Sequence, residues 1–244
     1  MNKLITTVIF PIFNKIYKDY PTLYIPIYFT YKYLQGISTA RFIKRWIKPG
    51  DTVVEVGSNI GSETWMLSRW VGMSGEVYAF EPDPYNFKHL KRNLSKSKNT
   101  YLNKMAVGDK NNYIKLYLSN DLNTDHQTFD IGDNRKSVRV KQITLDKYFP
   151  KKKKVRLIKI DVQGYDYHAF KGMVNLLSRS DDIALIGEFW PYALKRSGVS
   201  PQKYLNHIKK LGFKFVEPKK LISSKLKQEE DNRYFSLDFI ATKP

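Results

Sequence analysis

The stretch Asp51-Thr-Val-Val-Glu-Val-Gly57-Ser-Asn59-Ile-Gly61 decides the fold. Its first half is a short β-branched run, which predicts a buried strand. Its second half carries glycines that permit a tight turn with close approach of the backbone. Residues 62–71 follow without a helix breaker and predict a helix. A strand, a glycine turn and a helix in this order are typical of one half of a doubly wound α/β sheet.

The next segment supplies an acid where a nucleoside ligand needs one. Residues 76–81 predict a second strand that ends at Glu81, 20 positions after Gly61. A carboxylate at this place can accept hydrogen bonds from both ribose hydroxyls. Asn59 stands where the nicotinamide fingerprint has glycine, and no Gly-Lys-Ser/Thr follows, which excludes a Walker phosphate loop. The pattern therefore favours a nucleoside site of another kind.

The remaining pattern predicts one Rossmann-like α/β domain over residues 37–244, with a mostly parallel seven-stranded sheet and helices on both faces. Asp83 and Pro84 predict the start of a helix, and so do Ser200 and Pro201. The runs 113–118 and 137–143 are expected to form an insertion hairpin after the third strand. The last two strands are expected to pair antiparallel. Further strands are expected at 101–107, 155–160, 183–187, 213–216 and 234–241.

Residues 1–36 predict an aromatic-rich cap of short helices, followed by a helix that begins at Ser38 or Thr39 and ends before Pro49. Tyrosines and lysines alternate in this cap. Such a mixture can cover a cleft, pair with another subunit or lie on a membrane surface, and the sequence does not choose among these.

Composition limits the class of protein. The chain has no cysteine, which excludes disulfides, thiolate zinc sites and a cysteine nucleophile and fits a cytoplasmic enzyme, with a peripheral membrane association left open. The 42 Lys and Arg against 23 Asp and Glu give a net charge of +19. That excess favours polyanions or anionic membranes, but much of it is dispersed lysine, which favours a solvated surface.

Six motifs in consistent order over residues 37–244 resemble the FkbM family of S-adenosylmethionine-dependent methyltransferases. They are V-E-V-G-S-N-I-G at 54–61, A-F-E-P-D-P at 79–84, A-V-G-D at 106–109, I-T-L-D at 143–146, I-K-I-D-V-Q-G at 158–164 and G-E-F-W-P at 187–191. The resemblance implies a class I methyltransferase fold, S-adenosylmethionine as cofactor, and O-methylation, commonly of sugars in glycans or glycosylated natural products. Glu55 stands where the family more often has Asp, and Ser58 where it often has Ala; both replacements keep the chemistry.

On this interpretation the glycine turn and Glu81 hold the methyl donor. Glu81 is expected to bind the ribose hydroxyls, and Glu55 to orient the amino group of the methionine moiety. The expected cofactor-binding residues are Glu55, Gly57, Ser58, Asn59, Gly61, Glu81, Pro82, Ala106, Val107 and Asp161.

Asp161, Glu188 and His126 are the expected catalytic residues. Asp161 follows the fourth core strand and is expected to act on the acceptor hydroxyl as general base, or as ligand of a divalent cation such as Mg²⁺ together with Glu188. The family usually continues D-V-E-G-x-E, and Gln163 replaces the first Glu, which removes a charge that a metal site would use. His126 lies on the insertion loop, where the family has a similar Asp-His segment, and is a second candidate base. Trp190 and Tyr192 can stack on a sugar face.

Two other functions remain open. An acid after each of two neighbouring strands can belong to a Lys-Asp-Lys-Glu tetrad for ribose 2′-O-methylation, which makes RNA a less favoured acceptor than a sugar or glycan. There is no Asp/Asn-Pro-Pro-Tyr after the fourth strand, which disfavours methylation of base amino groups. The other alternative is a non-catalytic protein that keeps the fold and docks on a membrane or on a partner, itself included, through residues 1–36.

Overall fold

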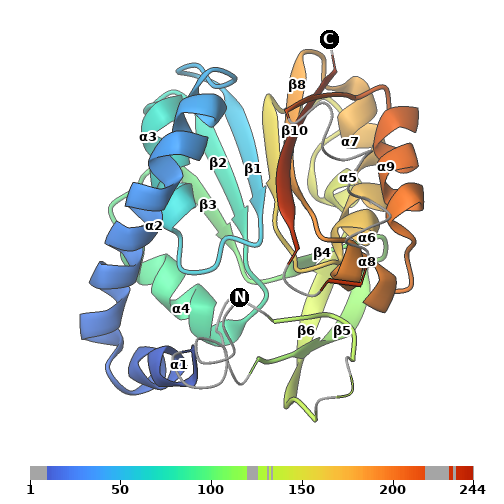
Figure 1. The fold of residues 1–244 in the computed structure, drawn as a ribbon. Coiled ribbons are helices and arrows are strands. Elements are labelled where there is room, and N and C mark those ends of the chain that lie inside the picture. The colour runs from blue at the N-terminus through green and yellow to red at the C-terminus, as the bar shows by residue number, and fades with distance from the viewer. Residues whose placement is uncertain are drawn as a thin grey trace.

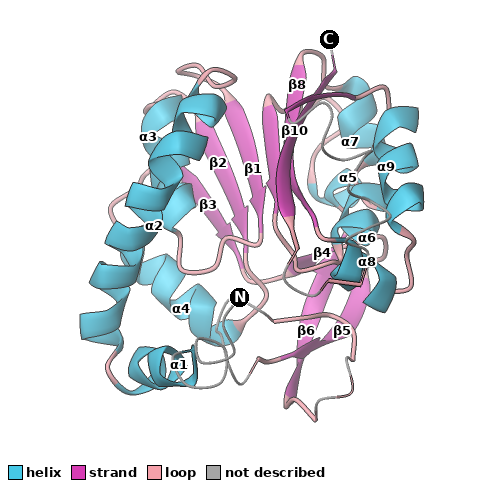
Figure 2. Ribbon diagram, in the orientation of Figure 1, coloured by secondary structure: helices cyan, strands magenta, loops and turns pink. Residues whose placement is uncertain are grey.

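The computed structural model describes residues 10–119, 126–130, 132, 134–217, 231–232 and 235–243. Its central sheet has seven strands, shown in Figure 1 and Figure 2. They are β1 (Thr52–Val56), β2 (Glu76–Phe80), β3 (Thr100–Asn103), β7 (Leu157–Ile160), β8 (Ile183–Phe189), β9 (Lys214–Glu217) and β10 (Leu237–Lys243). The strand order is β3-β2-β1-β7-β8-β10-β9, and only β10 runs antiparallel to its neighbours. The predicted Rossmann-like fold is confirmed.

Helices cover both faces of this sheet (Figure 2). On one face lie α2 (Pro21–Lys44), α3 (Ser62–Val71) and α4 (Pro84–Asn93); on the other lie α5 (Leu145–Tyr148), α6 (Asp166–Lys171), α7 (Val174–Arg179), α8 (Pro191–Arg196) and α9 (Pro201–Lys210). Alternate strand residues serve the two faces: Val53 packs with Ile43 and Leu67, whereas Val54 joins the core under α6, α7 and α9. Because both faces are covered, the parallel strands are apolar almost throughout.

The helix starts predicted at Asp83 and at Ser200 are both confirmed. The side chain of Asp83 accepts a hydrogen bond from the Asn86 amide at 2.7 Å, with Pro84 in the first turn. Ser200 caps α9 in the same way through the Lys203 amide at 3.3 Å. Each cap satisfies an amide that a helix start would leave without a partner.

The insertion forms a second, three-stranded sheet beside the carboxyl ends of the central strands (Figure 1). It consists of β4 (Ala106–Val107), β5 (Asn112–Tyr117) and β6 (Ser137–Ile143), and the predicted β5–β6 hairpin is confirmed as antiparallel. The predicted strand at 101–107 is wrong as one element. The Met105 amide donates to the Asn103 carbonyl at 3.0 Å, and this tight turn moves the chain from the central sheet to the small one.

The N-terminal region is helical where the structure describes it. α1 (Phe10–Asp19) is followed by α2, a single helix that includes Pro26 and runs through Ser38 and Thr39, so the predicted separate helix start there is wrong. The proposed boundary between residues 36 and 37 stays a prediction, but no change of secondary structure marks it. No helix among the described residues is long and apolar enough to cross a membrane.

Candidate cofactor and acceptor site

A cavity of about 580 Å³ lies at the carboxyl ends of β1, β2, β7 and β8. This is the edge at which open α/β sheets bind ligands, and β1 and β7 form the switch point of the strand order. Ten of the predicted site residues line the cavity: Gly57, Ser58, Asn59, Glu81, Pro82, Ala106, Val107, His126, Asp161 and Glu188. Glu55 and Gly61 are not among the lining residues.

The glycine turn is held tightly between β2 and β7. The amides of Gly57 and Ser58 both donate to the Phe80 carbonyl, at 2.9 and 3.0 Å. Gly57 has φ +90°, and a Cβ atom at this position would lie 1.9 Å from the carbonyl oxygen of Asp161. Gly61 has φ +88° and precedes α3. Both glycines are therefore required by the backbone itself, although only Gly57 reaches the cavity.

Glu81 is buried and fixed by backbone amides. Its Oε2 accepts from the Asn59 amide at 2.8 Å, and its Oε1 from the Asp83 amide at 2.9 Å. Burial raises the pKa of Glu81 to about 8. Each carboxylate oxygen can accept a second hydrogen bond. This arrangement fits the expected contact with a ribose diol.

Glu55 lies beneath the turn instead of at the cavity wall. It is only 1% exposed, and the Thr64 hydroxyl donates to its Oε2, which ties β1 to α3. Burial raises its pKa to about 8, and the charge of Lys159 opposes that shift. The structure thus gives Glu55 a place inside the fold, and its expected contact with a methionine amino group stays a prediction.

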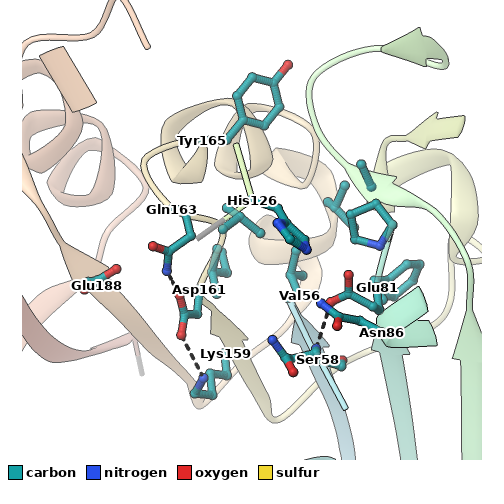
Figure 3. Close-up of a pocket in the computed structure, with 18 of the residues that line it drawn as sticks. Val56, Ser58, Glu81, Asn86, His126, Lys159, Asp161, Gln163, Tyr165 and Glu188 are labelled. Carbon is teal, nitrogen blue, oxygen red and sulfur yellow. Dashed lines mark hydrogen bonds and ion pairs between the residues drawn. The ribbon is translucent and has the colours of Figure 1, made fainter. Parts of the chain in front are cut away.

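Asp161 is held by two neighbours at the end of β7 (Figure 3). The Gln163 side-chain amide donates to its Oδ1 at 2.7 Å, and the Lys159 ammonium lies 3.8 Å from its Oδ2. Lys159 also pairs with Glu63 at 2.7 Å. Burial lowers the pKa of Lys159, but the surrounding carboxylates have the larger effect and raise this pKa overall. The set leaves Asp161 facing the cavity with a partly neutralised charge.

Glu188 lies on the strand beside Asp161, as expected, and both line the cavity. Its Oε2 is shielded from solvent and has no hydrogen-bond partner among the described residues. Burial and the charge of Asp161 raise the pKa of Glu188 to about 8. Within the described part of the chain no group of three His, Asp or Glu side chains is placed to hold a metal ion. The structure therefore does not support the divalent cation considered from the sequence.

Replacing Glu188 by glutamine is expected to stabilise the protein at alkaline pH. The folded state keeps this carboxyl protonated up to about pH 8, whereas in the unfolded chain it ionises near its ordinary pKa. The folded state therefore binds the extra proton, and stability falls as the pH rises toward 8. Between pH 6 and 8.5 we expect the melting temperature of Glu188→Gln to rise relative to wild type by about 2–4 °C.

Glu76→Gln is the matched control for this measurement. Glu76 pairs with Lys153, which lowers its pKa, so its charge stabilises the fold above its ordinary pKa. Its glutamine variant should be no more stable than wild type at either pH. The same pH trend in both variants would contradict the assignment to Glu188.

His126 reaches the cavity because the insertion loop folds back on β5. Tyr117 and Gln127 exchange backbone hydrogen bonds of 2.7 and 3.0 Å, and the Ser119 amide donates to His126 Nδ1 at 3.0 Å. An amide can only donate, so the neutral ring carries its hydrogen on Nε2, which lies 3.9 Å from Asp83 Oδ2. In this geometry neutral His126 can serve as a hydrogen-bond donor through Nε2, whereas its Nδ1 already accepts from the Ser119 amide. The structure thus favours Asp161 over His126 as the proton acceptor.

Several lining residues were not predicted. Lys159 had a signal, because a lysine in the middle of an apolar strand is rarely buried without a function or a partner. Glu63 and Gln163 lie two residues from the predicted Gly61 and Asp161. The others come from segments that only the fold brings together: Tyr28, Asn86, Tyr165, Ser236 and Asp238. Trp190 and Tyr192 do not line the cavity, and their rings pack 6.4 Å apart.

A family model described as the methyltransferase FkbM domain matches residues 55–215. No curated protein gives a significant match. The match spans the glycine turn, Glu81, the insertion, Asp161 and Glu188, which are the elements that build the cavity.

Solved structures of methyltransferases are similar to the chain at low sequence identity. A methyltransferase FkbM from Methylobacillus flagellatus KT is 14% identical with a TM-score of 0.48, over 79% of this chain and 43% of that one. A "putative rRNA-methylase" from Clostridium thermocellum is 14% identical with a TM-score of 0.52, over 85% and 94%. A SAM-dependent O-methyltransferase from Thermotoga maritima is 14% identical with a TM-score of 0.49, over 85% and 65%. The chain thus spans less than half the length of the FkbM structure.

Proposed function

Since the chain belongs to the FkbM family of S-adenosylmethionine-dependent methyltransferases, we propose that it methylates a hydroxyl group of a sugar or glycan. The charge of the cavity is the observation that carries the choice of acceptor. Its described lining includes one ammonium, that of Lys159, and five carboxyl groups. Those of Glu81 and Glu188 stay protonated up to about pH 8 in the free protein, and those of Glu63, Asp161 and Asp238 still outnumber the ammonium. Such a wall repels a polyanion and suits a neutral acceptor rich in hydroxyl groups.

S-adenosylmethionine supplies a methyl group that its sulfonium already activates. The residues present fit this donor, because the turn at Gly57 lets the backbone come close and Glu81 offers free acceptor capacity for a ribose. The carboxylates of the cavity also suit a cationic ligand. The protein's task is to align the acceptor hydroxyl with the methyl group and to exclude water.

Asp161 is the residue that takes the proton from the hydroxyl. A sugar hydroxyl is a weak nucleophile near neutral pH, so a base that accepts its proton during transfer lowers the barrier. The Gln163 amide fixes one oxygen of Asp161, and Lys159 attracts the other. His126 lies between Asp161 and Glu81 in Figure 3 and is suited to donate a hydrogen bond within the site.

An RNA ribose is the second candidate acceptor. Lys159, Asp161 and Glu188, on two adjacent strands or at their ends, match three of the four residues of a Lys-Asp-Lys-Glu tetrad for 2′-O-methylation. The net charge of +19 also favours RNA binding. The cavity has no second described lysine, however, and its carboxylates oppose the phosphates that flank a ribose. The sugar acceptor is therefore favoured.

Methyl transfer from isotope-labelled donor separates these acceptors. The purified chain is incubated with labelled S-adenosylmethionine and either a panel of neutral sugars and glycans or total RNA. Label in the sugar fraction supports the proposal. Label in RNA alone, with an affinity that falls steeply as salt rises, would replace it by the ribose reaction. A chain that binds no donor in calorimetry would instead be a non-catalytic protein.

Glu81→Gln is expected to weaken S-adenosylmethionine binding by about 10- to 100-fold. The cationic donor and its ribose hydroxyls favour ionised Glu81, whose pKa is about 8 in the free protein. Binding therefore releases a proton, and wild-type affinity should rise with pH until about pH 8 and then level off. The variant should lose this pH dependence, measured by titration calorimetry.

Glu76→Gln serves as the control, because Glu76 begins the strand β2 that Glu81 directly follows, but it lies outside the cavity. It should bind the donor as wild type does at every pH. Equal affinity and equal pH dependence of Glu81→Gln and wild type would show that Glu81 does not hold the ribose.

A further inference from the structure

One face of α2 exposes a stripe of apolar side chains. Leu23, Ile27, Tyr31 and Leu34 follow one another at helical spacing and are 53–62% exposed. Together with Ile12 and Tyr20 they make up six of the ten large apolar side chains that are exposed among the described residues. The other four are scattered over the rest of the domain, so the concentration within residues 12–34 requires an explanation.

The opposite face of α2 is already occupied by the protein. Ile25 is buried against Tyr17 and Ile60, and Phe29 meets Trp65 edge to face. Tyr28 on this side lines the cavity. The helix is thus apolar on two faces, and only one of them is covered within the described part of the chain.

The charges around α1 and α2 indicate what kind of surface covers the exposed face of α2. Residues 10–48 contain seven Lys or Arg but one acidic residue, Asp19. Among these cations Lys15 is exposed on α1, and Lys44, Arg45 and Lys48 are exposed at the end of α2. Two copies of such a surface repel each other, and so do two chains of charge +19. An apolar stripe with tyrosines, flanked by cations, matches a membrane surface of anionic lipids.

We propose that α1 and α2 dock on an anionic membrane surface, with the stripe of Leu23, Ile27, Tyr31 and Leu34 inserted among the lipids. Figure 1 shows α2 along the outside of the domain, where no other described element lies over it. Tyr28 reaches the cavity from the other side of the same helix. Docking therefore brings the cavity within about one helix diameter, or 10 Å, of the lipid surface. Membrane docking of this kind depends neither on the acceptor nor on catalysis.

Vesicle flotation of the full chain tests this inference. Wild type should float with vesicles of phosphatidylcholine mixed with phosphatidylglycerol, and less with phosphatidylcholine alone. Binding should weaken as salt rises, because the cations contribute through a screened attraction. Equal flotation with both kinds of vesicle, or with neither, would overturn the proposal.

A variant of the stripe and a matched control locate the contact. Leu23→Ser, Ile27→Ser and Leu34→Ser combined should lower vesicle binding by at least about tenfold. Met73→Ser with Tyr113→Ser removes exposed apolar side chains elsewhere and should bind as wild type does. Calorimetry with S-adenosylmethionine shows whether each variant is folded, since none of these residues lines the cavity.

Two results would contradict the membrane. Unchanged vesicle binding of the folded triple variant would show that the stripe is not inserted. A wild type that is dimeric by light scattering and ignores vesicles, with a monomeric triple variant, would show that a second copy covers the stripe.

Discussion

Asp161→Asn is expected to lower the turnover of methyl transfer by about a thousandfold while S-adenosylmethionine still binds. Asparagine keeps the size of the side chain and can still meet Gln163, but it cannot accept the hydroxyl proton. The barrier rises because Asp161 is the base of the proposed reaction, whereas Glu81, which is also a fixed carboxyl group of the cavity, is assigned to the ribose of the donor. Single-turnover rates and calorimetry measure the two effects separately.

Asp181→Asn is the control for the same chemical change away from the cavity. Asp181 forms an exposed ion pair with Lys154 and precedes β8 at its amino end. Its variant should keep wild-type turnover. An Asp161→Asn enzyme that turns over at the wild-type rate would show that Asp161 does not accept the proton of the hydroxyl group. His126 would then be the remaining candidate base.

Much of the fold followed from local pattern. Residues close together in the sequence determine the buried strands, the glycine turn, the caps at Asp83 and Ser200 and the β5–β6 hairpin. Each of these features was therefore predicted from the local sequence. The strand expected at 101–107 failed because one tight turn at Asn103 decides which sheet the chain enters, and apolar spacing continues across it.

The prediction of a separate helix start at Ser38 or Thr39 was wrong for a related reason. Serine and threonine at 38 and 39 are good caps, and residues 1–36 were expected to form a separate cap of short helices. The proline is tolerated inside α2 because packing of Ile25 and Tyr28 against the domain outweighs the loss of one helical hydrogen bond. Local propensity was overridden by tertiary contact.

The candidate site divides in the same way. The residues that are positioned by the glycine turn and by the ends of the strands could be predicted, since the carboxyl ends of parallel strands meet at one edge of the sheet. Asp238 was not, because only the antiparallel register of β10 places it opposite Glu188. The orientation of the His126 ring was also hidden, since it depends on the bridge between Tyr117 and Gln127.

Gly57→Ala is expected to abolish donor binding and to lower the melting temperature by about 10 °C or more. The added Cβ would lie 1.9 Å from the Asp161 carbonyl oxygen, a backbone atom that cannot move without displacing β7. Relief of the clash therefore separates the turn from the strand end that carries Asp161. The distance between the cofactor half and the acceptor half of the cavity is then no longer fixed.

Gly198→Ala isolates the part of this effect that is due to the left-handed backbone alone. Gly198 has φ +82°, close to the +90° of Gly57, but a Cβ atom added to Gly198 would meet nothing within 4 Å. Alanine there should cost only about 1–2 kcal/mol and should leave donor binding intact. Because the two glycines share the strain and differ in the contact, the difference between the variants measures how much the fold depends on the turn being pressed against β7. Equal losses in both would mean that the turn needs glycine only for its dihedral angles, and that Asp161 is positioned by β7 without help from the donor site.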